Sequence, residues 1–238
     1  LTVQSGAVVA VAGSGQAAFV GENFETALQA QVKIGDTAIP FALVKFSIIP
    51  SGGAAATFAG GATSVYVFAG ASGTATAPAI TANGAVGSYS VAASVPGIAS
   101  VAQFSLLNRG RTTTTVSTQP QPSVYGQEVA ITAQVAPVAP AAGTPGGTIT
   151  FKDGNTTLGT AALINGVATL KSSSLAVGAH SITAGYGGST IFAASASAPA
   201  GHTVNKADTT TGLTISPAGT VYGQVLTLST RVTANAPG

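Results

Sequence analysis

Hydrophobic and polar residues alternate along many short stretches of the chain. Within residues 28–34, the hydrophobic residues are Leu28, Ala30, Val32 and Ile34, and the polar ones are Gln29, Gln31 and Lys33. Similar runs occupy residues 44–48, 89–93, 102–106, 129–135, 148–152 and 181–186. A period of two residues buries one face of a β-strand and leaves the other face in water. Helical spacing does not recur, so the pattern predicts an all-β fold.

Turn-forming dipeptides separate these runs. They are Asn83-Gly84, Asp153-Gly154, Asn165-Gly166 and Gly187-Gly188. Asn-Gly and Asp-Gly tolerate the positive φ angles that tight hairpins require. Short strands with frequent turns over about 100 residues indicate a β-sandwich.

An internal repeat predicts how the chain is divided. Residues 112–114 recur as 209–211, and residues 124–127 recur as 221–224, each pair 97 positions apart. A β-sandwich of the immunoglobulin type has about this length. The predicted domains are therefore a divergent sandwich at residues 1–108, a complete repeat at residues 109–206, and the first strands of a further, incomplete repeat at residues 207–238.

Two short polar segments, residues 107–111 and 205–208, are the predicted linkers between these domains. Short linkers favour an extended arrangement of the sandwiches. Residues 1–4 carry no charged leader and no initiator methionine, which indicates a mature or excised piece.

The composition leaves few groups for chemistry. Only 8 Lys and Arg and 6 Asp and Glu occur among 238 residues, together with 2 histidines and no cysteine. The missing cysteines exclude disulfides, thiolate metal sites and cysteine nucleophiles. The acids are scattered, whereas a glycosidase needs a fixed pair of carboxylates and Ca²⁺ needs several oxygen ligands on one loop. They are Glu22, Glu25, Asp36, Glu128, Asp153 and Asp208.

We therefore expect no enzyme activity, no catalytic or metal-binding residues and no cofactor. The net charge is +2 without a basic cluster, so no nucleic-acid partner is predicted. No apolar run approaches about 18 residues, so no membrane insertion is predicted for this segment. His180 and His202 are interpreted as partly buried strand residues. Tyr125 and its repeat counterpart Tyr222 are interpreted as packing residues at a strand entrance.

Particular motifs in residues 112–206 resemble the bacterial Ig-like repeat that occurs in tandem in large extracellular proteins. They lie at residues 123–127, 147–154, 165–169 and 175–184. The segment departs from the family at Tyr186-Gly187-Gly188-Ser189, where the family usually has an acid in the last position. Residues 1–108 resemble the Ig-like domains of invasin-type adhesins, mainly at residues 20–24, 56–61 and 82–89.

The resemblance implies tandem Ig-like β-sandwiches outside a bacterial cell or on its surface. The leading hypothesis is a structural segment, an adhesin stalk or a filament subunit, that associates with neighbouring copies or repeats. A host or surface glycan or protein would then be bound at a distal tip. The alternative is a spacer or carbohydrate-binding accessory module of a secreted enzyme. A sugar platform would require a row of exposed aromatic residues, whereas tryptophan is absent and most Tyr and Phe are predicted to face inward.

Overall fold

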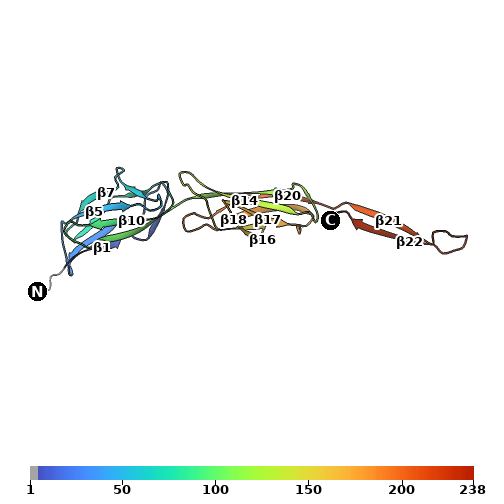
Figure 1. Ribbon diagram of the computed structural model, residues 1–238, viewed down its shortest axis with the longest axis horizontal. Coiled ribbons are helices and arrows are strands. Elements are labelled where there is room, and N and C mark those ends of the chain that lie inside the picture. The colour runs from blue at the N-terminus through green and yellow to red at the C-terminus, as the bar shows by residue number, and fades with distance from the viewer. Residues whose placement is uncertain (1–4) are drawn as a thin grey trace. The chain divides into compact units, whose positions relative to one another are not determined.

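The computed structural model describes residues 5–238 (Figure 1). The leader prediction for residues 1–4 therefore lies outside the described residues. Residues 5–238 contain 22 β-strands and no helix, so the predicted all-β class is confirmed. It follows that this part of the chain has no helix with the length and apolarity needed to cross a membrane.

The chain forms two compact units. Unit 1 contains the residues up to Thr113 together with 135–147 and 187–195. Unit 2 contains residues 114–134, 148–186 and 196–238. The predicted boundaries at 108 and 206 and the extended arrangement stay predictions.

Unit 1 contains three sheets. The first is formed by β1 (Gly6–Ala12), β3 (Gln29–Ile34) and β4 (Thr37–Ala38), with β8 (Thr74–Thr76) also paired to β3. The second has the order β2 (Gln16–Phe19), β11 (Ala102–Arg109), β10 (Gly87–Ser94), β5 (Leu43–Ile49) and β7 (Ser64–Phe68). The third pairs β6 (Ala56–Phe58) with β9 (Ile80–Ala82).

The core of unit 1 follows from the period of two. Each central strand directs alternate side chains inward, as in β5, where Val44, Phe46 and Ile48 are buried. Inward residues of the first sheet, such as Val32, belong to the same buried cluster as those of the second sheet, such as Phe104. Burial of these apolar faces against each other is the main source of stability of such a sandwich.

Residues 112–205 form a second sandwich from two sheets. One sheet has the order β12 (Thr112–Gln119), β14 (Val129–Pro137) and β17 (Val167–Ser172). The other has the order β13 (Ser123–Val124), β20 (Ala200–Asn205), β18 (Gly178–Tyr186), β15 (Thr148–Asp153) and β16 (Thr156–Ala162), with β19 (Ser195–Ala196) paired to β18. Buried residues alternate along β14 and β18.

Of three turns predicted from the sequence, one is the expected hairpin and two are not. Asn165 and Gly166 both have positive φ, 52° and 78°, as the predicted hairpin requires. Asn83-Gly84 is not a hairpin, because it connects β9 in one sheet to β10 in another. The Asn83 amide instead donates to the Gly53 carbonyl at 2.9 Å, and its Oδ1 accepts from the amide of Asn108 at 3.0 Å. Gly187-Gly188 begins an irregular loop.

The linker prediction for residues 107–111 is wrong for its first three residues. Residues 107–109 continue β11, because Leu107 and Asn108 pair with Ser88 and Gly87 of β10. Only two residues separate β11 from β12. Of the second predicted linker, residues 205–208, Asn205 is the last residue of β20, and residues 206–208 lie between strands.

The 97-residue repeat is reproduced strand by strand. β21 (Thr209–Ser216) occupies the positions of β12 shifted by 97, and β22 (Thr227–Ala234) occupies those of β14 apart from its first residue. β21 and β22 pair with each other along their whole length. Their inward-type residues are uncovered: Leu228 is 60% exposed and Val232 63%, whereas the equivalent Ile131 and Val135 are 0% and 3% exposed.

Replacement of Phe104 by Ala tests the packing of unit 1. The ring is fully buried and lies 6.1 Å from that of Phe46. We expect Phe104→Ala to lower the free energy of unfolding by about 3–5 kcal/mol, because it removes apolar contacts and leaves a cavity. The measurement is denaturant unfolding followed by circular dichroism. Phe68→Ala, at an exposed position, is the matched control and should change stability by less than about 0.5 kcal/mol; equal losses would contradict the described core.

Candidate functional site

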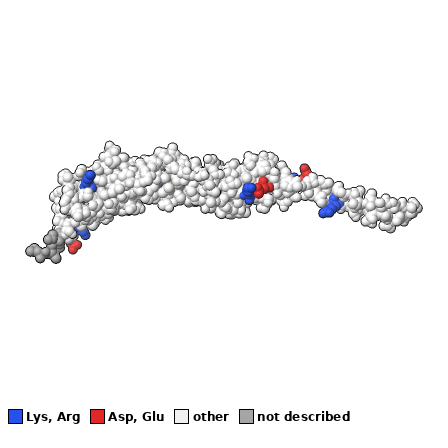
Figure 2. Space-filling view, in the orientation of Figure 1, with Lys and Arg blue, Asp and Glu red and all other residues white. Residues whose placement is uncertain are grey.

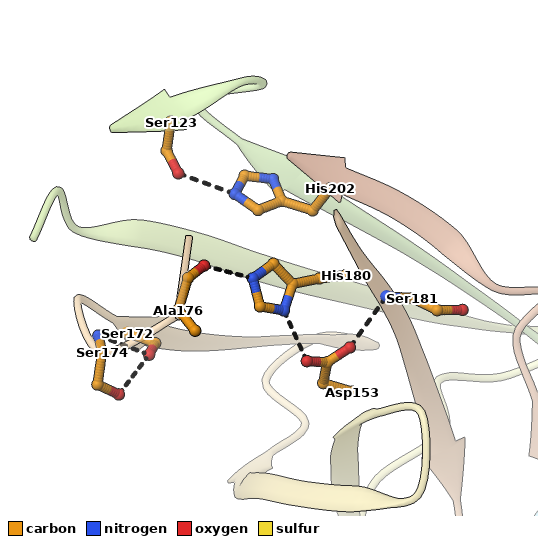
Figure 3. A network of polar contacts seen from close by, with 8 residues as sticks. All are labelled: Ser123, Asp153, Ser172, Ser174, Ala176, His180, Ser181 and His202. Atoms are coloured by element: carbon orange, nitrogen blue, oxygen red, sulfur yellow. Dashed lines mark hydrogen bonds and ion pairs between the residues drawn. The ribbon is translucent and has the colours of Figure 1, made fainter. Parts of the chain in front are cut away.

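Two histidines lie opposite each other on neighbouring strands of unit 2 (Figure 3). His180 on β18 pairs with His202 on β20, and their ring centroids are 6.4 Å apart. His202 occupies an inward position in the alternation of β20 and is 1% exposed. The two rings are the best candidate in unit 2 for a site with chemistry of its own.

His180 is held between two groups that only accept hydrogen bonds. Its Nδ1 lies 2.6 Å from Oδ2 of Asp153, and its Nε2 lies 2.7 Å from the carbonyl oxygen of Ala176. Since a carboxylate and a backbone carbonyl cannot donate, both ring nitrogens donate and the ring is an imidazolium. Burial lowers the pKa of His180, but the hydrogen bond and charge of Asp153 and the Ala176 carbonyl together outweigh it, so the pKa is raised.

Asp153 is adapted to the same pairing. It ends β15, and its second carboxylate oxygen accepts a hydrogen bond from the Ser181 amide at 2.9 Å. Burial raises the pKa of Asp153, but the hydrogen bonds from His180 and Ser181 and the charge of His180 outweigh this effect. The pKa of Asp153 is therefore lowered, and the carboxylate stays charged beside His180.

His202 has the opposite surroundings. Its Nε2 lies 2.9 Å from Oγ of Ser123, and its Nδ1 lies 3.1 Å from Oγ1 of Thr118. A hydroxyl group can both donate and accept, so a neutral ring satisfies both partners. Burial, and then the charge of His180, lower the pKa of His202. The ring joins β20 to β13 in its own sheet and to β12 in the opposite sheet.

The serine, histidine and aspartate of this network are not arranged as a catalytic triad. In a triad one imidazole contacts both the nucleophile and the orienting carboxylate. Here Ser123 contacts His202 and Asp153 contacts His180. Ser123 is also only 1% exposed, so its oxygen faces the protein interior. What the arrangement does is cross-link strands and bind protons.

The remaining acids named from the sequence lie apart from this network. Glu22 forms an ion pair with Arg111, and Glu128 forms one with Lys171, each at 2.8 Å and each more than half exposed. Among residues 5–238, no group of three or more Asp, Glu or His side chains could hold a metal ion. Charged side chains are sparse on the face of the molecule in Figure 2.

The exposure of several aromatic residues differs from what the sequence predicted. Tyr125 follows β13 but is 49% exposed, so the prediction that it is a packing residue is wrong. Most Tyr and Phe are inward as predicted, yet Phe41, Tyr66 and Phe68 are 60–70% exposed. The sequence carried a signal for the strand that bears two of them, because residues 64–68 combine β-branched and aromatic residues without a turn former.

We expect the stability of unit 2 to depend on pH in two opposite steps. His180 has a raised pKa, so its stabilising effect is complete below pH about 6.5 and is lost as the pH rises through its folded pKa. His202 has a lowered pKa, so stability falls as the pH drops below about 6.5, through its folded pKa. Asp153 adds a further loss below pH about 3.8.

The measurement is urea unfolding between pH 4 and 9. His202→Gln can keep hydrogen bonds to both hydroxyls but cannot be protonated, so it should lose less stability than the wild type between pH about 6.5 and 4. His180→Gln is the matched control and should remove the alkaline step. Parallel profiles for wild type and His202→Gln would contradict the assignment of a neutral, buried His202.

One family of known proteins matches part of the chain. Residues 114–205 match the bacterial Ig-like domain family, group 3. Among proteins with a curated description, none matches the chain.

Several solved structures are similar at low identity. The Escherichia coli adhesin FdeC is 16% identical with a TM-score of 0.46, covering 85% of this chain and 65% of its own. The Yersinia pseudotuberculosis adhesin InvE is 15% identical with a TM-score of 0.38, covering 84% of this chain and 58% of its own. The fibronectin(III)-like modules of Clostridium thermocellum CbhA are 14% identical with a TM-score of 0.34, covering 84% of this chain and 94% of their own.

The chain thus spans less than two thirds of the length of either adhesin structure. The family match covers the segment whose motifs suggested an Ig-like repeat, and the strands of that segment form two facing sheets. The predicted resemblance of this segment and the Ig-like β-sandwich fold are confirmed: residues 114–205 match the bacterial Ig-like domain family, group 3.

Proposed function

We propose that the chain is a structural segment of a repetitive bacterial protein that acts outside the cell or on its surface. It is a segment of an adhesin stalk or of a surface fibre, and it acts by tandem assembly of β-sandwiches. One observation carries this proposal: β12 and β14 recur as β21 and β22, shifted by 97 residues. A protein that repeats a complete packing unit gains length by adding units of the same fold.

The surface of the chain supports a mechanical function. Only 14 charged residues occur in 238, and exposed hydrophobic side chains lie on several strands. Weakly charged surfaces with open strand edges tend to associate. Association with neighbouring copies or adjacent repeats, including strand sharing between them, is therefore part of the proposal. A glycan or protein at a distal tip remains the proposed external partner, and nucleic acid is not.

A non-catalytic function is the simplest reading of the histidine network. Each nitrogen of both rings is already hydrogen-bonded to a protein group. A general base needs a free nitrogen within reach of a substrate proton. We therefore propose that His180 and His202 stabilise unit 2 and that the segment is not an enzyme.

One observation favours the second candidate, a carbohydrate-binding accessory module of a secreted enzyme. Tyr66 and Phe68 stand on the same exposed face of β7, and Phe41 is exposed just before β5. Aromatic faces can stack on sugar rings. Binding of soluble oligosaccharides to the full chain, abolished by Tyr66→Ala and Phe68→Ala, would favour this candidate over a purely structural segment.

Surface labelling tests the leading proposal. Antibodies raised against the full chain should bind intact cells of the bacterium that encodes it, or material shed from those cells. A cytoplasmic protein probed on the same cells is the control and should be labelled only after lysis. Labelling of the segment that also requires lysis would contradict an extracellular structural function.

A further inference from the structure

β7 lies at the edge of the second sheet of unit 1. It pairs with β5 on one side, and in the part of the chain that the structure describes no strand pairs with its other side. Unpaired strand edges present rows of backbone donors and acceptors that can bind another strand.

The register of β5 and β7 shows which backbone groups are free. Ile48 donates its amide hydrogen to the Thr63 carbonyl, and Ala69 donates to the Ala42 carbonyl, both at 2.9 Å. Residues in an antiparallel pair alternate between those that bond to the neighbouring strand and those that point away from it. Val65 and Val67 therefore bond to β5, and the amides and carbonyls of Ser64, Tyr66 and Phe68 point to the open edge.

The edge lacks the charges, proline and bulges that commonly protect against pairing. Residues 64–68 contain no charged residue, no proline and no glycine, and no bulge interrupts the pairing with β5. Natural proteins block exposed edges with charged side chains, proline, bulges or a covering element. Tyr66 and Phe68 add apolar area on the exposed face, 60% and 68% exposed, next to Leu43 of β5.

We infer that β7 is a self-association site that pairs with β7 of a second copy of this chain, antiparallel about a twofold axis at Tyr66. The outward residues are self-complementary in this register, because Tyr66 lies opposite Tyr66 and Ser64 lies opposite Phe68 of the partner copy. Each such pair exchanges two backbone hydrogen bonds. The two second sheets then form one continuous sheet, a symmetric interface of the isologous kind. This inference rests on the proposed structural function and identifies β7 as the surface through which copies associate.

The side chains fit the same register. Four aromatic rings, Tyr66 and Phe68 from each copy, lie on one face of the joined strands, where cross-strand aromatic pairs are favourable. Lys45 is a charge close to this face, with its Nζ 5.8 Å from the centre of the Tyr66 ring. The two copies of Lys45 are separated by three strand spacings, about 14 Å, which exceeds the screening length of about 8 Å at physiological salt.

Single-cysteine cross-linking of the full chain tests both the pairing and its register. The chain has no cysteine, so each variant has one thiol. In the proposed register, the two Cα atoms at position 66 are about 5.5 Å apart, within disulfide range. The two Cα atoms at position 68 are about 14 Å apart, too far for a disulfide. Under mild oxidation, Tyr66→Cys should form a covalent dimer at least about tenfold faster than Phe68→Cys.

Sedimentation velocity of variants without cysteine supplies the second measurement. The wild-type chain should show a dimer that increases with concentration. Tyr66→Lys should abolish it, because it places two lysines opposite each other. Ile49→Lys is the matched control, since Ile49 is a similarly exposed hydrophobic residue on β5, away from the edge, and it should leave the dimer intact.

Three outcomes would overturn the inference: a monomeric wild-type chain at high concentration, equal cross-linking at positions 66 and 68, or a dimer that Tyr66→Lys leaves unchanged. A monomer that binds oligosaccharide through Tyr66 would also overturn it, and would assign the aromatic face to sugar. None of these outcomes would alter the surface-labelling result, so failure of edge pairing is distinguishable from failure of the proposed function.

Discussion

The packing of two apolar sheet faces against each other is the interaction on which the structure depends. Because the chain has no cysteine and so no disulfide, the alternating residues of strands such as β5 and β14 supply most of the stabilising burial. Where the opposing sheet is present, Ile131 is fully buried, and where it is not, the equivalent Leu228 is 60% exposed. The burial of these alternate positions therefore depends on the sheet that faces them.

The period of two was sufficient to predict the class and the main strands, because a strand directs every second side chain to the core, as for the buried Phe46 and Phe151. It could not predict which strands pair, since pairing is a long-range property. Asn83-Gly84 shows this: the dipeptide allows a hairpin, but the Asn83 side chain instead hydrogen-bonds Gly53, Ala55 and Asn108. The different protonation states of His180 and His202 could not be predicted from the sequence either, because they depend on acceptors and hydroxyl groups that other segments of the chain supply.

Polar residues of the second sandwich connect strands by side-chain hydrogen bonds, which apolar residues cannot form. His202 connects the two sheets through hydroxyl groups, and His180 and Asp153 connect the end of β15 to β18. One ring is charged and the next is neutral, so this end of the sandwich is sensitive to protons. Its stability is therefore expected to fall in acid through His202 and to fall at higher pH through His180. The proposed pairing of β7 edges would not depend on ionic contacts, because residues 64–68 carry no charge.

The most direct test of the sheet-packing account is to place a facing sheet over β21 and β22. Gly238 corresponds to Ala141 in the repeat, so residues 142–206 appended after it would complete a sandwich around β21 and β22. Hydrogen exchange of the β22 amides should then slow to resemble that of β14. A fusion whose inward residues equivalent to Ile149 and Phe151 are aspartate is the control, and β22 should stay unprotected there. Fast exchange of β22 in the complete fusion would contradict the account.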